Sequence, residues 1–136
     1  MKNNIVVNSP GLPEVLFITS YPPREDGIAT YSQDLIRALN SKLSHSFKIS
    51  ICPLESETEK HNYTDEIKYV LNTDQPNSFL KLANKINDNV DITMVILQHE
   101  FRFFVKKEDD LRLFLAVLTK PVAWSITQYY HIQTNP

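Results

Sequence analysis

The chain has 136 residues, 42% of them apolar and 22% charged, which suits one folded domain. A net charge of −2 gives no electrostatic signature of a nucleic-acid or anionic-membrane partner, and the single cysteine, Cys52, excludes an intrachain disulfide. Because only two glycines occur, neither a G-x-G-x-x-G dinucleotide turn nor a Walker A phosphate loop can be assembled.

Strand-like and helix-like patterns alternate along the chain. Short runs of β-favouring apolar residues predict strands, and apolar residues spaced three and four apart predict helices. The predicted elements are, in order, strand 15–19, helix 28–43, strand 47–52, a polar loop at 55–65, short strand 69–71, helix 79–86 with Asn77 or Ser78 as its cap, strand 92–97, helix 109–118 and a strand that begins at Pro121.

This order predicts an α/β fold, a Rossmann-like parallel sheet sandwiched by helices. Such folds bind ligands at the carboxyl ends of their strands. Two polar segments follow strongly predicted strands, residues 20–30 after the first and residues 98–104 after the strand at 92–97. We therefore expect the functional residues in these two segments.

The first segment places Gly27 and Ile28 at the start of the first long helix. A helix N-terminus presents unpaired N–H groups and a partial positive charge, which suit a phosphate or carboxylate. Glycine there lets a ligand approach the backbone closely. The alternative interpretation is structural, with Gly27 relieving a tight turn and Asp26 capping the helix.

The second segment begins with Gln98, His99, Glu100 and Phe101. A neutral His99 can bond a sugar hydroxyl, and Glu100 can accept one or orient the imidazole. The alternative is a structural histidine held by a backbone partner. The remaining histidines show no metal-ligand spacing with Cys52 or with one another, so we expect neither a metal site nor a cofactor.

The sequence also lacks the features of a membrane or exported protein. Its longest apolar stretches, 94–97 and 113–118, are much shorter than the ~20 residues that a bilayer requires. The N-terminus lacks a signal peptide's long apolar segment and cleavage site. Together with the lone cysteine, these observations lead us to expect a cytoplasmic protein without a transmembrane segment.

Residues 18–31, ITSYPPREDGIATY, resemble the opening of glycosyltransferase family 4 enzymes, which have the two-domain GT-B fold. The family pattern is a strand, a Pro-Pro-Arg turn and then Gly-Ile-Ala-Thr at the start of the first helix. Residues 98–101, QHEF, are similar to a segment after a later strand in a bacterial subgroup, and residues 120–122, KPV, to the start of the next strand.

The resemblance implies retaining transfer of a hexose from a nucleotide-sugar donor to a carbohydrate acceptor, usually without metal. It implies that Gly27 and Ile28 approach the donor phosphates, whereas His99 and Glu100 are our predicted acceptor or sugar contacts. The family's C-terminal domain, with its Glu-x7-Glu motif, is absent from this sequence, so we assign no catalytic residue and expect the chain alone to be inactive. The competing interpretation is a free-standing, non-catalytic α/β binding module.

Two single residues depart from the family pattern. Asp26 stands where the subgroup usually has a small residue, and a carboxylate facing a phosphate site would repel the ligand. Arg102 replaces the glycine that usually follows Gln-His-Glu-Phe.

A larger departure begins at Trp124, because residues 124–136 lack the family's His-Thr-Val-Leu-Pro signature. If the codons from Trp124 onward are read one nucleotide earlier, the genetic code permits Val-Val-Tyr-His-Thr-Val-Leu-Pro-His-Pro-Asp. We therefore predict an incomplete N-terminal domain at 1–123 and an out-of-frame or atypical tail at 124–136, which would pack poorly.

Overall fold

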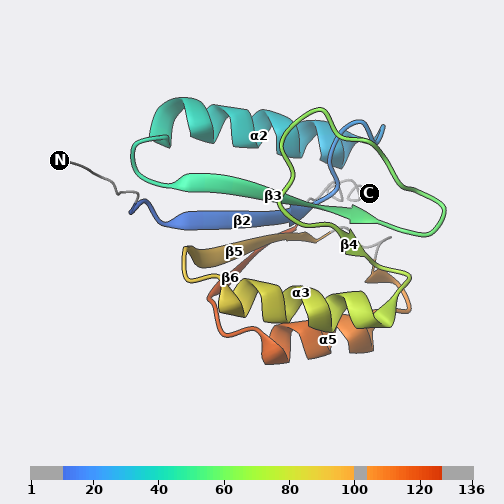
Figure 1. Ribbon diagram of the computed structural model, residues 1–136. Coiled ribbons are helices and arrows are strands. Elements are labelled where there is room, and N and C mark those ends of the chain that lie inside the picture. Colours follow the sequence, from blue (N-terminus) through green and yellow to red (C-terminus); the bar gives the residue numbers. More distant parts are fainter. Residues whose placement is uncertain (1–10, 100–103, 127–136) are drawn as a thin grey trace, which may run out of the picture.

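The structure is a computed structural model that describes residues 11–99 and 104–126. Its centre is a five-stranded parallel sheet with the strand order β4-β3-β2-β5-β6 (Figure 1), which confirms the predicted α/β, Rossmann-like fold class. The described elements are β2 (Glu14–Thr19), α2 (Gly27–Leu43), β3 (Lys48–Glu55), β4 (Leu71–Asn72), α3 (Pro76–Asp88), β5 (Ile92–His99), α5 (Glu108–Val117) and β6 (Val122–Ile126).

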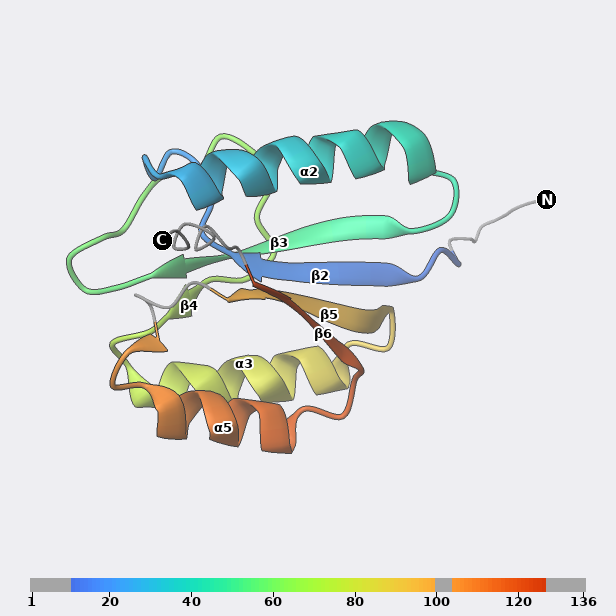
Figure 2. The same ribbon diagram turned by 180° about the vertical axis from the view of Figure 1, so that it is seen from behind.

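Helices cover both faces of the sheet. α2 lies on one face, and α3 and α5 lie side by side on the other, as both views show (Figures 1 and 2). Side chains alternate along a strand, so successive residues of β2 enter different core clusters. Leu16 and Ile18 pack in the cluster that contains Phe79 of α3, whereas Phe17 packs with Ile36 of α2. Burial on both faces explains the nearly continuous apolar run of β2.

Several element boundaries differ from the predictions, and those of β3, β4 and α3 differ most: β3 extends to Glu55 rather than 52. β4 covers only Leu71–Asn72 rather than 69–71, because it pairs with just the last two residues of β3. α3 begins at Pro76, before the predicted cap at Asn77 or Ser78. Proline suits the first helical turn, since its φ is already helical and its missing N–H has no partner to lose there.

The strand order reverses between β2 and β5. From β2 the chain moves outward to β3 and β4, and then returns to place β5 on the other side of β2. β2 and β5 are paired in parallel, with Ile18 opposite Leu97. In open α/β sheets such a reversal leaves a crevice beyond the carboxyl ends of the two central strands. Both predicted functional segments follow these two strands.

β6 continues across the predicted boundary between residues 123 and 124. Trp124 pairs with Leu97 of β5, and its side chain is 47% exposed. The rest of the predicted tail, residues 127–136, lies outside the described residues. Within the part of the chain that the structure describes, no helix is long and apolar enough to cross a membrane.

Candidate functional site

The loop after β2 turns sharply to begin α2 at the carboxyl edge of the sheet. Tyr21 is buried, and its carbonyl accepts a hydrogen bond from the Arg24 N–H at 3.1 Å, which closes the turn. The peptide bond between Pro22 and Pro23 is cis. This turn leads to Gly27, the first residue of α2.

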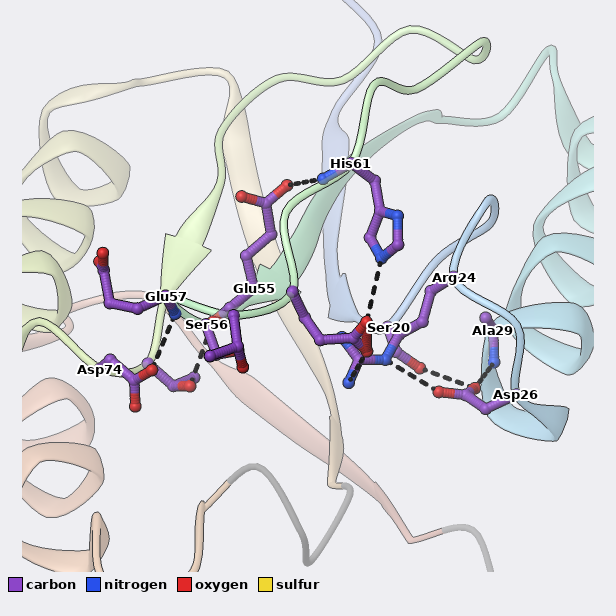
Figure 3. A network of polar contacts seen from close by, with 12 residues as sticks. Ser20, Arg24, Asp26, Ala29, Glu55, Ser56, Glu57, His61 and Asp74 are labelled. Atoms are coloured by element: carbon purple, nitrogen blue, oxygen red, sulfur yellow. Dashed lines mark hydrogen bonds and ion pairs between the residues drawn. The ribbon is translucent and has the colours of Figure 1, made fainter.

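Asp26 is the N-cap of α2, as the structural interpretation of this loop predicted. Its Oδ1 accepts a hydrogen bond from the Ala29 N–H at 2.7 Å, and its Oδ2 lies 3.0 Å from Arg24 Nε. The Asp26 carboxylate therefore satisfies one of the N–H groups at the start of α2. The Arg24 guanidinium balances its negative charge. Figure 3 shows Asp26 between Arg24 and Ala29.

Gly27 is not explained by backbone conformation or packing. Its φ is outside the left-handed region, and a Cβ built on it would meet nothing within 4 Å among the described residues. The backbone N–H groups of Gly27 and Ile28 donate to no acceptor in the described ranges, whereas Ala29 and Thr30 donate to Asp26. The start of α2 thus combines open space with two available donors.

The second predicted segment begins at the end of β5, the strand that pairs with β2. His99 is the last residue of β5, and its backbone pairs with Ile126 of β6. The two predicted segments therefore begin at the carboxyl ends of two adjacent strands, β2 and β5. The side chain of His99 and all of Glu100 lie outside what the structure describes, so their contact with Gly27 or with a sugar stays a prediction.

Residues 56–70, which we call the strap, connect β3 to β4. Its first part lies near the carboxyl edge, and its second part runs back along β3, where the Lys68 N–H donates to Ile51 O at 2.9 Å. Glu59 of the strap forms an ion pair with Arg24 at 2.8 Å, and Tyr21 Oη donates to Asp65 of the strap at 2.6 Å. Tyr63 Oη donates to Glu55 Oε2 at 2.7 Å. The sequence interpretation left most of this segment as a polar loop, because the partners lie far apart in sequence and give no periodic signal.

These contacts decide which groups carry charge. Burial and the bond to Asp65 raise the pKa of Tyr21, so the phenol stays a neutral donor. The same bond lowers the pKa of Asp65 and keeps its carboxylate ionised. Burial also raises the pKa of the Tyr63 phenol and of the Cys52 thiol, so the thiol is an inert core group. The described residues contain no group of three or more His, Cys, Asp or Glu that could hold a metal ion.

Comparisons with protein-family models, with curated proteins and with solved structures found no match to this chain. The likeness of residues 18–31 and 98–101 to glycosyltransferases therefore rests on the residues themselves.

Proposed function

We propose that this chain is the acceptor-side, N-terminal domain of a retaining glycosyltransferase with the GT-B architecture. The observation that carries the proposal is Gly27: it stands at the strand-order reversal, next to open space, with its own N–H and that of Ile28 available. The likeness of residues 18–31 to the family's first loop supports the same assignment.

The start of α2 suits a donor diphosphate. Phosphate oxygens accept bonds from unpaired helix N–H groups and are favoured by the positive end of the helix dipole. A side chain at position 27 would fill the space that the phosphate needs. Asp26 opposes an anion here, but its ion pair with Arg24 offsets part of the carboxylate charge.

The proposed acceptor is a carbohydrate whose hydroxyls bond His99, the last residue of β5, and Glu100, the next residue in the sequence. Transfer requires a second domain that holds most of the nucleotide-sugar and closes over the crevice. We therefore expect no glycosyl transfer by the 136-residue chain alone, and turnover of any nucleotide-sugar by the purified chain would overturn this part of the proposal.

A second candidate is a free-standing binding module that does not catalyse. It is favoured by the closed core, because helices cover both faces of the sheet and two clusters of buried residues fill the layers. A downstream reading frame that encodes Glu-x7-Glu would favour the glycosyltransferase, and its absence would favour the module.

The phosphate site can be tested with inorganic pyrophosphate on the ¹⁵N-labelled chain. We expect the amide signals of Gly27 and Ile28 to shift on addition. Gly27→Val should weaken binding about tenfold or more, equivalent to about 1.4 kcal/mol, with unchanged circular dichroism. Ser41→Val, at an exposed position near the end of the same helix, is the matched control and should bind like wild type. Equal affinity of Gly27→Val and wild type would return Gly27 to a structural role.

A further inference from the structure

His61 of the strap has a buried side-chain nitrogen that finds no hydrogen-bond partner among the described residues. Its Nε2 is sealed from solvent and makes no hydrogen bond within the described ranges. Glu59 Oε2 lies 3.8 Å away, too far for a hydrogen bond but within range of an ion pair if the imidazole is protonated. Buried polar atoms are nearly always hydrogen-bonded, so this nitrogen requires an explanation.

Glu59 connects His61 to the start of α2. Its other oxygen, Oε1, lies 2.8 Å from Arg24, and Arg24 Nε lies 3.0 Å from Asp26, the cap of α2. The two carboxylate oxygens of Glu59 thus face two different basic groups, and both can be bound at once. Figure 3 shows His61, Arg24 and Asp26 along this line of contacts.

Acidic side chains lie beside His61. Tyr63 and Glu59 face His61 from the strap, and Glu55 faces it from the end of β3, where its Oε2 accepts the His61 backbone N–H at 3.3 Å. Arg24 places one permanent positive charge beside Glu59. A proton on His61 adds a second positive charge beside Glu59.

We propose that His61 is a proton-sensitive clamp that fastens the strap to the loop after β2. When the imidazole takes a proton from solvent, Nε2–H donates to Glu59, which then holds His61 and Arg24 together. When the imidazole is neutral, Nε2 loses this bond and the strap opens more readily. The clamp goes beyond the proposed function and does not depend on it, because it involves only groups of this chain.

The direction of the pH dependence follows from which form is stabilised. In this proposal the closed strap gains the bond to Glu59 only with a protonated imidazole, so the stabilisation is present in mild acid and is lost as the pH rises. Imidazole is the side chain whose ordinary pKa places its charge change between about pH 5 and 8. The window of the clamp is therefore about pH 5 to 7.5.

Hydrogen exchange measured by NMR on the 136-residue chain tests the clamp. The reporters are the amides of Glu59 and His61, which donate to Ser56 O and to Glu55 Oε2. After correction for intrinsic exchange, their protection should be about three- to tenfold greater at about pH 5.5 than at about pH 7.5. The Asn89 amide, which donates to Ile86 O at the end of α3, is the reference and should show no such change.

Variants separate His61 from other titrating groups. His61→Gln keeps an N–H donor but cannot titrate, so the pH dependence should disappear. His45→Gln, at an exposed position beyond α2, is the matched control and should keep it. If His61→Gln fails to fold by circular dichroism, Glu59→Gln tests the acceptor side and should also remove the dependence. Equal protection at both pH values in wild type, or a dependence that survives in the folded variant, would overturn the proposal.

Discussion

Arg24 holds three parts of the carboxyl edge together. Its Nε lies 3.0 Å from Asp26 at the start of α2, and its terminal nitrogen lies 2.8 Å from Glu59 on the strap. The Arg24 side chain is only 14% exposed, so these bonds are poorly screened by water. The conformation of the loop beside Gly27 therefore depends on a residue that belongs to neither helix nor strand.

The charge of Asp26 gives the first prediction. Asp26→Asn keeps a side-chain oxygen that can accept the Ala29 N–H but removes the negative charge from the helix end. We expect pyrophosphate binding to strengthen about two- to fivefold, because a charge at a helix end contributes about 0.3–1 kcal/mol. The measurement is titration calorimetry, with Asp34→Asn on the exposed side of α2 as the control. Weaker binding by Asp26→Asn would show that the carboxylate supports the site instead.

Tyr21 gives the second prediction, on stability and pH. Tyr21→Phe removes the hydrogen bond to Asp65 and should lower the free energy of unfolding in urea by about 1 kcal/mol at neutral pH. Because the bond lowers the pKa of Asp65, its stabilisation is present above the unfolded carboxyl pKa of about 3.9 and is lost as pH falls through the lower folded value.

Wild type should therefore lose more stability than Tyr21→Phe between about pH 5 and pH 2. Tyr31→Phe, at an exposed position on α2, should follow the wild-type curve. Parallel curves for wild type and Tyr21→Phe would contradict the assigned role of this bond.

At the scale of elements, polar contacts join the end of α3 and the turn after it to the connection between α5 and β6. Asn87 of α3 donates to Val117 O and accepts the Thr119 N–H. Lys120 Nζ donates to the carbonyls of Asn89 and Ile92, on either side of the turn between α3 and β5. The bonds to Val117 O and Asn89 O satisfy carbonyls that the ends of α5 and α3 leave unpaired.

Lys120 gives the third prediction. Lys120→Met keeps most of the aliphatic stem but loses two charge-assisted hydrogen bonds. The free energy of unfolding should therefore fall by about 2 kcal/mol. Urea denaturation should show a lower midpoint with an unchanged slope. Lys81→Met, at an exposed position on α3, is the control and should change the midpoint little. Equal midpoints for the two variants would show that the bonds of Lys120 contribute no net stability.

At the scale of the whole molecule, the topology decides where a ligand can bind. The chain moves outward to β4, crosses back and places β5 beside β2, so residues about 80 apart in sequence reach one edge. α2, which follows β2 in the chain, covers one face of the sheet, and α3 and α5 cover the opposite face (Figure 2). The position of the proposed site therefore follows from the strand order, which brings the first loop and the end of β5 to the same edge.

The reading frame of the tail gives the fourth prediction. We expect the nucleotide sequence from codon 124, read one nucleotide earlier, to spell Val-Val-Tyr-His-Thr-Val-Leu-Pro-His-Pro-Asp. Sequencing the coding DNA gives the answer directly, and codons that do not encode this string in the shifted frame would exclude a frameshift. The strand geometry of Trp124 does not decide the question, because an exposed edge of a sheet accepts many sequences as a strand.

The amino-acid sequence by itself determined the fold class, the order of the elements and the two segments at the carboxyl edge. Apolar periodicity is local, so the run at β2 and the three-to-four spacing in α2 could be read without tertiary information. The bounds of short elements were predicted less accurately. β4 has only two residues, and its ends depend on pairing with β3.

Only the tertiary structure decided how the loops meet. The capping role of Asp26 was one of two open alternatives, and the bonds from Arg24 to Glu59 and from Tyr21 to Asp65 were not predicted. These partners lie 35 and 44 residues apart, and polar residues in loops follow no repeating pattern. Their pairing is set by the strand order and by the path of the strap, because a hydrogen bond between distant loops forms only after the sheet has brought their ends together.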